Sequence, residues 1–290
     1  MLRQEVQLRN IHQFIIRMPS LTTTVMKVFE VCNSPSVSPY DLNRVISLDP
    51  VLTGKVLRLI NSAYYGLPQR IASLTRAIIM LGINTVKNLV LATSVLAGCK
   101  RLGTIKAIPV DDFWAHSLGS GVISKTVARI QRVPTENQEM YFVAGLMHDL
   151  GKLPMMACYP ELYDQALGHA AGSQLLLFQA EQVRFGFDHC QIGSLIAARW
   201  KLDETMKHAM VNHHQAAEGI RAPQSLLDNV RLANLMACHF KIGAAGEGTV
   251  DMLLLHSLAE RCGVTLKALV SVRPQIEQEI QNAKVFLQTA

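Results

Sequence analysis

The sequence contains no CxxC pair, no secretory signal and no apolar run long enough to cross a membrane. Its six cysteines lie far apart, so neither a zinc-ribbon site nor a disulfide framework is indicated. The longest near-apolar run, residues 89–99, falls short of the roughly 20 residues that span a bilayer. We therefore expect a protein without membrane segments, located in a reducing cytoplasm.

Charge and aromatic residues are also scarce. Charged residues make up 17% of the chain and aromatic residues 6%, and the net charge is only +6 over 290 residues. Because the basic residues are dispersed and no aromatic-basic recognition segment occurs, no nucleic-acid partner is expected, and we interpret the positive excess as a solvated surface. The hydrophobic fraction of 49% supplies ample material for a core and excludes a disordered chain.

No convincing alternation of polar and apolar residues indicates a strand, whereas signals for helix starts recur through the first hundred residues. Ser38 and Asp49 each precede a proline at the first helical position, and Ser73 opens a further helix. Gly82 is expected to end that helix, and Asn84 to cap the next one. This half of the chain is predicted to be all-α.

The second half resumes the helical pattern after residues 99–112, which combine basic residues, a glycine, a proline and two acids and so indicate a boundary. Asp203 should cap a helix that ends in two histidines, and residues 225–240 should form another. A loop is expected at 243–248. Residues 249–290 are expected to form one apolar helix followed by a mostly polar one.

The stretch VAGLMHDLGKLPM, residues 143–155, places His148 and Asp149 side by side among apolar residues. Burying two ionisable groups costs several kcal/mol unless each finds a partner. Gly151 and Pro154 are expected to end the helix that carries this stretch. Imidazole and carboxylate groups together suit zinc, iron or manganese. The spacing of the histidines alone does not show that they converge.

Each candidate also has a plain structural interpretation. His116 could be a helix residue bonded to a neighbour, and His189 could belong to a capped helix start. His213 and His214 would be stabilised near a helix C-terminus by the dipole without any metal. Lys152 could be a C-terminal charge with the same effect. The His148–Asp149 doublet is harder to explain in this way, because apolar residues surround it.

Five segments occur in the order found in the HDOD family, an offshoot of the HD phosphohydrolase superfamily. Residues 14–240 resemble that module as a whole, and the segments NSAYYG (61–66) and GLMHDLGK (145–152) are specific to it. The segments are MPSL at 18–21, then 47–92, FWAHSL at 113–118, AGLMHDLGK at 144–152, and 185–202. The resemblance implies an all-α, multi-helix fold with an N-terminal regulatory subdomain (1–105) packed on an HD-like helical subdomain (106–290).

The resemblance also implies a ligand set. The catalytic relatives use a histidine, the His-Asp doublet, further histidines and a closing aspartate, with a lysine that contacts phosphate. The matching positions here are His116, His148, Asp149, His189, His213, His214 and, in place of the closing aspartate, Asn234, with Lys152 as the lysine. The segment HHQAAEGIRAP also lacks the Gly-Tyr-Pro pattern of the cyclic-di-GMP phosphodiesterases.

Charge counting limits the predicted metal content. Two divalent ions bring four positive charges, and Asp149 is the only carboxylate in the set, so a second ion would be poorly compensated. The sequence thus favours at most one ion (Fe, Mn, Zn or Mg), held by His116, His148, Asp149 and Asn234.

Three functions follow from the resemblance. The favoured one is a non-catalytic bacterial signalling module that acts through an unidentified protein partner, with NSAYYG in a structural role or as a contact surface. The alternative is a metal-dependent phosphohydrolase that acts on a nucleotide or cyclic dinucleotide, with Asp149 and Lys152 as catalytic residues. The third is a pocket that senses a nucleotide ligand without turnover. Asn234 and the missing Gly-Tyr-Pro pattern favour the first.

Overall fold

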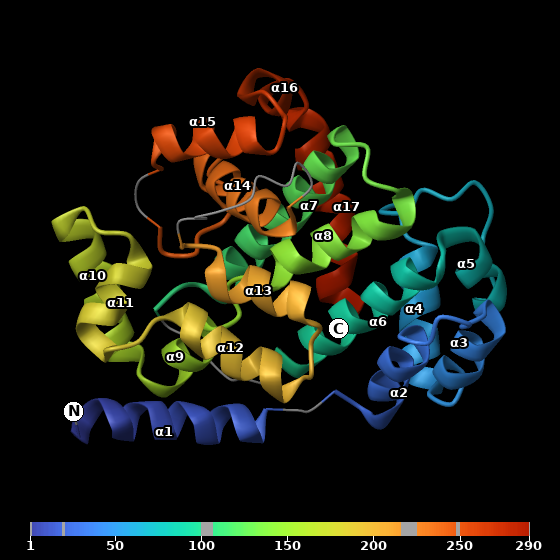
Figure 1. The fold of residues 1–290 in the computed structure, drawn as a ribbon, viewed down its shortest axis with the longest axis horizontal. Coiled ribbons are helices and arrows are strands. Elements are labelled where there is room, and N and C mark those ends of the chain that lie inside the picture. The colour runs from blue at the N-terminus through green and yellow to red at the C-terminus, as the bar shows by residue number, and fades with distance from the viewer. Residues whose placement is uncertain (1, 19–20, 100–106, 216–224, 248–249, 290) are drawn as a thin grey trace.

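The computed structural model describes residues 2–18, 21–99, 107–215, 225–247 and 250–289 (Figure 1). Within these ranges the chain is helical and forms no strand, which confirms the predicted all-α class. The subdomain boundary predicted at residue 105, half of the 99–112 segment and nearly all of the residues that follow the histidine pair in HHQAAEGIRAP lie outside the described residues. The two-part division therefore stays a prediction.

The N-terminal helices begin where their capping residues predict. Ser38 and Asp41 form a reciprocal capping box. An Asp49 carboxylate oxygen accepts from the Leu52 amide at 2.9 Å, and Ser73 caps the following helix. The helices are α1 (Leu2–Arg17), α2 (Thr23–Cys32), α3 (Pro39–Ile46), α4 (Pro50–Ile60), α5 (Leu74–Leu81) and α6 (Ile83–Cys99).

The predicted cap at Asn84 is wrong, because α6 already begins at Ile83. Gly82 ends α5 with a φ of 85°, and its carbonyl oxygen accepts the Val86 amide at 3.3 Å, so the next helix starts immediately after it. Asn84 lies inside the helix, and its side-chain amide donates to Asn137 at 3.2 Å.

The C-terminal half is built around one long helix, α7, which packs against α8, α14 and α17 and lies near the middle of the molecule (Figure 1). Its helices are α7 (Val110–Ile130), α8 (Thr135–Met147), α9 (Lys152–Cys158), α10 (Pro160–Ser173), α11 (Leu177–Phe185), α12 (His189–Arg199), α13 (Glu204–Asn212), α14 (Leu226–His239), α15 (Met252–Arg261), α16 (Leu266–Ser271) and α17 (Arg273–Thr289). The predicted Asp203 cap and the helix at 225–240 are confirmed.

Glycine lets α7 and α8 approach closely. A Cβ on Gly145 would lie 2.7 Å from the Ser120 carbonyl oxygen, and one on Gly121 would lie 2.7 Å from the Phe142 carbonyl oxygen. Neither position has room for a side chain. The close contact holds the end of α8, where His148 follows, directly against the helix that carries His116.

Two predicted helix ends differ from the structure. Pro154 lies in the first turn of α9 and so belongs to a helix start, where its missing N–H costs nothing, and not to a helix end. The terminal segment forms three helices where two were predicted. Gly263, with a φ of 65°, follows α15, and Thr265 then caps the short α16.

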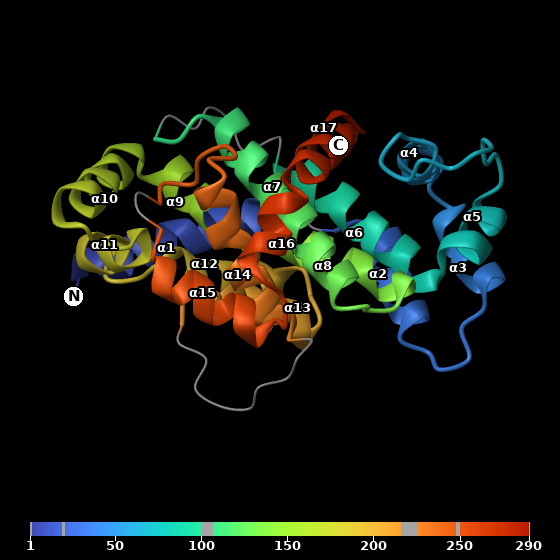
Figure 2. The same ribbon diagram turned by 90° about the horizontal axis from the view of Figure 1, so that it is seen from above.

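The two ends of the chain pack on parts distant in sequence. Helix α1 runs along α9 and α12, whereas α17 packs on α4, α6 and α7 (Figures 1 and 2). In the described residues no single helix is long and apolar enough to cross a bilayer. Only the pair α5 and α6, bent by 115°, reaches that length and composition together.

Candidate metal centre

The side chains predicted as ligands converge from separate helices. All but one are at most 3% exposed, and His214, the exception, has a side chain that is 11% exposed. They are His116 on α7, His148 and Asp149 after α8, Lys152 at the start of α9, His189 on α12, His213 and His214 after α13, and Asn234 on α14.

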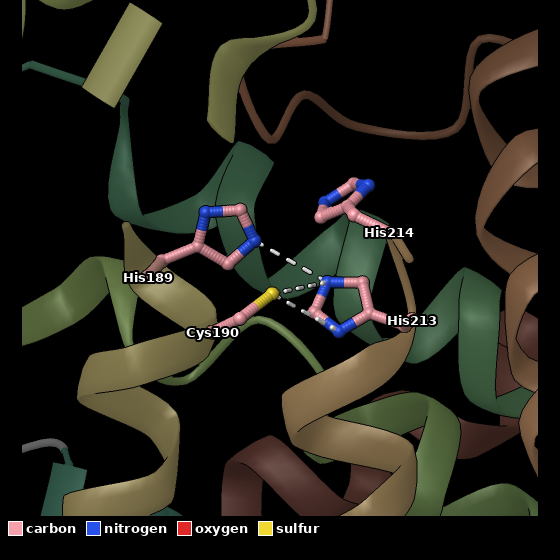
Figure 3. A group of neighbouring side chains, drawn as sticks. All are labelled: His189, Cys190, His213 and His214. Carbon is pink, nitrogen blue, oxygen red and sulfur yellow. Dashed lines mark hydrogen bonds between the residues drawn. The ribbon is translucent and has the colours of Figure 1, made fainter. Parts of the chain in front are cut away.

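Three donor atoms have the spacing of metal ligands. The Nε2 atoms of His189 and His213 are 3.3 Å apart (Figure 3), and they lie 3.4 and 3.5 Å from Asp149 Oδ1. Ligands at ~2.1 Å from a tetrahedral ion are separated by about 3.4 Å, the edge of the tetrahedron. His189, His213 and Asp149 therefore already have the spacing of one face of such a site.

Backbone carbonyls orient two of the imidazoles. Nδ1 of His148 donates to the Gly145 carbonyl at 2.7 Å, and Nδ1 of His213 donates to the Met210 carbonyl at 2.9 Å. Because a carbonyl oxygen only accepts, Nδ1 carries the proton in both rings. Each Nε2 is thus directed toward Asp149, the arrangement typical of metal-ligating histidine.

A buried carboxylate that the sequence did not reveal orients the third imidazole. One oxygen of Glu181 accepts from both Nδ1 and the backbone N–H of His189, at 2.6 and 2.9 Å, and its other oxygen accepts from the Tyr163 hydroxyl at 2.7 Å. Burial opposes a charge on His189, but Glu181 and Cys190 together outweigh burial and raise the pKa of the ring well above its usual range. No local signal in the sequence marks Glu181.

The ammonium of Lys152, for which the resemblance implies contact with a phosphate, is bound to protein oxygens in this structure. Its ammonium donates to Asp149 at 2.8 Å, to Glu247 at 2.8 Å and to the Ala245 carbonyl at 2.9 Å, so all three hydrogens have acceptors within the protein. Burial opposes the charge, but the two carboxylates outweigh it and raise the pKa of Lys152. The alternative interpretation of Lys152 as a charge at a helix C-terminus is wrong, because Lys152 begins α9.

Glu247 is a second group that sequence reasoning missed. It lies in the predicted loop at 243–248, and one of its oxygens lies 2.8 Å from the Lys152 ammonium and 3.9 Å from His214 Nε2. The count of a single carboxylate near the site was therefore wrong, since Asp149, Glu181 and Glu247 all take part. One residue of that loop, Gly248, lies outside the described residues.

The charges of the cluster correspond to one divalent ion. Three carboxylates and one ammonium leave two negative charges when the imidazoles are neutral. Burial opposes a charge on His213, but the Cys190 thiolate and Asp149 outweigh it and raise the pKa to about 9. Because the Nε2 atoms of His189 and His213 are 3.3 Å apart, at most one of them carries a proton in the metal-free protein, and a divalent ion bound there would displace it.

Asn234 is bonded to the histidine with which it was expected to share an ion. Its side-chain oxygen lies 3.0 Å from Nε2 of His116, whereas that nitrogen lies 3.8 Å from Asp149. Burial lowers the pKa of His116 to about 4, so the ring is neutral and can donate to the amide. His116 and Asn234 satisfy each other, and the geometry favours His189, His213 and Asp149 as the first ligands.

The side chains around His213 add a soft donor and a stacked ring. The sulfur of Cys190 lies 3.7 Å from Nδ1 of His213 (Figure 3), and His214 stacks on Phe178 with the ring centroids 4.8 Å apart. Burial raises the pKa of the Cys190 thiol, but attraction to the two nearby imidazoles outweighs burial and lowers it to about 7. In the sequence, only the position of Cys190 directly after His189 could have indicated that this cysteine lies near the site.

Unpartnered buried atoms test whether the residues fit a metal ion. Within the part of the chain that the structure describes, the cluster contains four buried atoms without a hydrogen-bond partner: His148 Nε2, Asp149 Oδ1, His214 Nε2 and Glu247 Oε2. Each such atom costs about 1–3 kcal/mol, so four of them in one cluster indicate a ligand. The nitrogen-rich donor set fits Fe, Mn or Zn better than Mg.

Among the described residues, a small cavity adjoins the cluster. A cavity of about 40 Å³ lies beside it, lined by His213, His214, Arg231, Asn234 and Glu247 together with leucine side chains. Since one water needs ~10–15 Å³ of such volume, the cavity has room for about three waters. A nucleotide would require the surrounding helices to move apart.

An all-helical fold with a His-Asp doublet after one helix and histidines from three others defines an HD-type helical domain. The family model for the HDOD domain matches residues 18–216, more than half of the chain, and the chain belongs to this family. The matched range includes the histidines and Asp149 but ends before Asn234 and Glu247.

Known relatives agree with this fold. An HDOD domain protein with unknown function from Geobacter sulfurreducens is 24% identical, with a TM-score of 0.75 over 97% of each chain. A protein from Shewanella amazonensis SB2B, provisionally named a phosphohydrolase, is 20% identical, with a TM-score of 0.68 over 94% of this chain and 97% of that one.

Among curated proteins, an uncharacterized protein of Treponema pallidum (strain Nichols) is 23% identical over 220 residues, which are 75% of this chain. The match spans only 41% of that relative's length, so the relative contains much that this chain does not match.

Proposed function

We propose that this chain is a non-catalytic HDOD module of bacterial signal transduction, located in the cytoplasm, that acts through contacts with a protein partner. The observation that carries the proposal is the state of Lys152. The lysine that would hold a substrate phosphate donates all three hydrogens to protein oxygens and is fully buried.

The closed surroundings of the cluster support the same proposal. Metal-dependent hydrolysis needs an ion-bound water beside an accessible phosphorus. Asp149, His148 and His189 are fully buried, and the adjoining cavity of about 40 Å³ is far smaller than the ~300 Å³ or more of a typical ligand pocket. We infer that the cluster serves stability rather than turnover.

A metal ion fits this role. When bound, a divalent ion supplies positive charge and ties its ligands together. Asp149, His189 and His213 would hold it, so the end of α8, the start of α12 and the end of α13 would be joined at one point. The chain's own residues already orient those ligands through Glu181 and the backbone carbonyls.

Exposed apolar side chains support a protein contact. Helices α3, α4 and α5 pack on one another and carry, with the turn between α3 and α4, five large apolar side chains that are 49–69% exposed. They are Tyr40, Leu48, Val51, Ile79 and Met80. Exposed apolar side chains on helices that pack together make this region the candidate surface for a protein contact.

The retained donors keep one second candidate, a metal-dependent phosphohydrolase of a nucleotide or cyclic dinucleotide. The His-Asp doublet and the three histidines from α12 and α13 favour it. In that function Asp149 would hold the ion, and Lys152 would have to leave its three acceptors to reach a phosphate.

Metal analysis combined with a hydrolysis assay separates the two functions. We expect the full chain, supplied with Mn²⁺, Fe²⁺ or Zn²⁺, to release no product from a cyclic dinucleotide or a chromogenic phosphodiester. Metal-dependent turnover that disappears in His148→Ala would overturn the proposal.

The protein contact needs its own measurement. Leu48→Asp combined with Val51→Asp should abolish capture of a protein partner from the source bacterium, whereas Leu253→Asp on α15, where the side chain is 85% exposed, should not. Equal capture by both variants would remove α3 and α4 as the contact surface.

A further inference from the structure

We propose that the Cys190 thiolate is a ligand of the metal ion that His189 and His213 would hold, so that this position prefers Zn²⁺ to Mn²⁺. The inference deepens the proposed function, on which it rests, by naming the donor that completes the metal centre. It concerns the atoms bonded to the ion, which are measured independently of turnover.

Cys190 reaches the cluster because helix α12 begins there. Asp188 caps the helix by accepting from the Gln191 amide at 2.9 Å, so His189 and Cys190 are its first two residues. Successive helical side chains point about 100° apart, yet His189 is 0% exposed and Cys190 is 5% exposed. Figure 3 shows the sulfur and the His189 ring extending from this turn toward His213.

The surroundings of the sulfur differ from those of a cysteine that only fills space. Sγ of Cys190 lies 3.7 Å from Nδ1 and 3.9 Å from Nε2 of His213. One donor atom each from His189, Cys190, His213 and His214 lies within 4.8 Å of the others. A buried free thiol usually behaves as a small hydrophobe, whereas this one faces imidazole nitrogens. The position therefore suits a metal ligand.

Asp149 gives independent evidence that a cation binds here. Its Oδ1 is buried, has no hydrogen-bond partner among the described residues, and lies 3.4 and 3.5 Å from Nε2 of His189 and His213. A carboxylate oxygen buried in this way is costly unless a cation pairs with it. Nitrogen and sulfur ligands of one tetrahedral ion are about 3.6 Å apart. The Cys190 sulfur, at 3.9 Å from Nε2 of His213, is close to that separation.

Displaced protons balance the charge of such an ion. Coordination to a divalent ion deprotonates a thiol outright. An ion at this position also displaces the one proton that the Nε2 atoms of His189 and His213 can carry between them. The two positive charges that enter then equal the two protons that leave, so the charge of the buried cluster does not change.

A sulfur ligand has two consequences for the metal centre. Thiolate donors favour Zn²⁺, whereas Mn²⁺ and Mg²⁺ are better suited by oxygen ligands. Structural zinc sites have four protein ligands, and catalytic ones keep a position for water. With Asp149, His189 and His213 already in place, Cys190 would take the position that a hydrolytic water needs, which agrees with a non-catalytic module.

The test looks for a metal–sulfur bond in the full chain. Wild type would be loaded with equimolar Zn²⁺ for X-ray absorption spectroscopy at the zinc edge, and with Co²⁺ for ultraviolet–visible absorption. We expect a zinc–sulfur distance of ~2.3 Å and a thiolate-to-cobalt charge-transfer band in the near ultraviolet. Zinc bound only by nitrogen and oxygen, or no bound zinc, would overturn the proposal.

Variants identify which sulfur is bound. Cys190→Ser should abolish the charge-transfer band and weaken Zn²⁺ binding by at least about 10-fold, while Mn²⁺ binding changes by less than about twofold. Cys262→Ser is the matched control, because Cys262 is also free and buried. Cys238→Ser should keep the band, since Cys238 lies instead beside His116 and Glu247. A band that survives in Cys190→Ser, or disappears in Cys238→Ser, would overturn the proposal.

The wild-type spectra give an answer even if Cys190→Ser fails to fold, because they need no variant. The outcome is also separate from that of the proposed function. Turnover by the metal-loaded wild type would overturn the proposed function even where a zinc–sulfur bond is found. A zinc site without sulfur would remove Cys190 as a ligand, whereas the buried Lys152 would still support the proposed function.

Discussion

Glu181 would not bind the metal ion itself, but it orients His189, one of the residues that would. It accepts the Nδ1 proton of His189 and is itself held by Tyr163, so the ring has one orientation. Outer partners of this kind raise the basicity of the ligand and fix its tautomer. The strength of the metal site therefore depends on a carboxylate at the start of the second turn of α11, remote from Asp149 in sequence.

Glu181→Gln should weaken metal binding by roughly 10- to 100-fold. The amide keeps the shape of the side chain but cannot accept the Nδ1 proton with a full negative charge, so His189 becomes a poorer ligand. Competition with a chromogenic chelator measures the change in Kd for Zn²⁺. Glu161→Gln, an exposed position on α10, is the control and should leave Kd unchanged. An unaltered affinity in Glu181→Gln would show that His189 does not bind the ion.

Gly151 is a second residue whose role is steric. A Cβ there would meet the His189 carbonyl oxygen at an impossible distance and the Gly193 amide nitrogen at 2.7 Å. The start of α9 and the first turns of α12 therefore touch through their backbones, which sets the separation between Lys152 and His189.

Gly151→Ala should destabilise the fold and disturb the metal site together, because α12 must move outward to admit the methyl group. Overpacking of this kind costs typically 1–3 kcal/mol. Chemical denaturation gives the change in free energy of unfolding, and Zn²⁺ titration gives the change in Kd. Gly168→Ala on α10, where nothing lies within 4 Å of the added Cβ, is the matched control. A stable Gly151→Ala chain with full affinity would contradict the backbone contact.

At the scale of elements, helix starts were predictable because capping is local. Ser38, Asp49, Ser73 and Asp203 lie within four residues of the amides they bind, so a short sequence window contains the whole interaction. The predicted cap at Asn84 was wrong, because the helix after α5 starts directly after Gly82, whose backbone conformation ends α5.

The candidate site was only partly predictable. The family resemblance supplied His116, the His-Asp doublet and the later histidines, but not their distances. Glu181 and Glu247 contribute through tertiary packing of α11 and of the loop after α14, which no spacing rule encodes. Without those carboxylates the charge of the cluster could not be counted correctly, nor could the acceptors of Lys152 be known.

The start of α12 offers a prediction at this scale. Asp188 caps the helix by accepting from the Gln191 amide at 2.9 Å, and the next residue is His189. Asp188→Ala should cost about 1 kcal/mol of stability, because the first turn of α12 loses its cap. Asp188→Asn should retain most of that stability, since asparagine also caps well. Denaturant unfolding of wild type, Asp188→Ala and Asp188→Asn measures the free energy of unfolding of each. Equal stability of Asp188→Ala and wild type would show that the cap contributes nothing.

At the scale of the whole molecule, parts outside the matched family range complete the module. Helix α1 precedes residue 18 and packs on α9 and α12, while α14 and the loop after it follow residue 216 and bring Asn234 and Glu247. An N-terminal helix thus packs on two helices that carry cluster residues, and C-terminal residues supply Asn234 and Glu247 to the cluster itself. The HDOD range alone does not contain the full environment of Lys152.

Ile15 and Ile16 test the contribution of α1, because they are adjacent but differ in burial. Ile15 is 2% exposed and Ile16 is 43% exposed. Ile15→Ala should destabilise the chain by about 2–4 kcal/mol through lost burial and a cavity beneath α1. Ile16→Ala should change stability by no more than about 0.5 kcal/mol. Urea unfolding followed by circular dichroism measures both. Equal effects would mean that α1 is not docked on the body of the protein in solution, and proteolysis would then remove it readily.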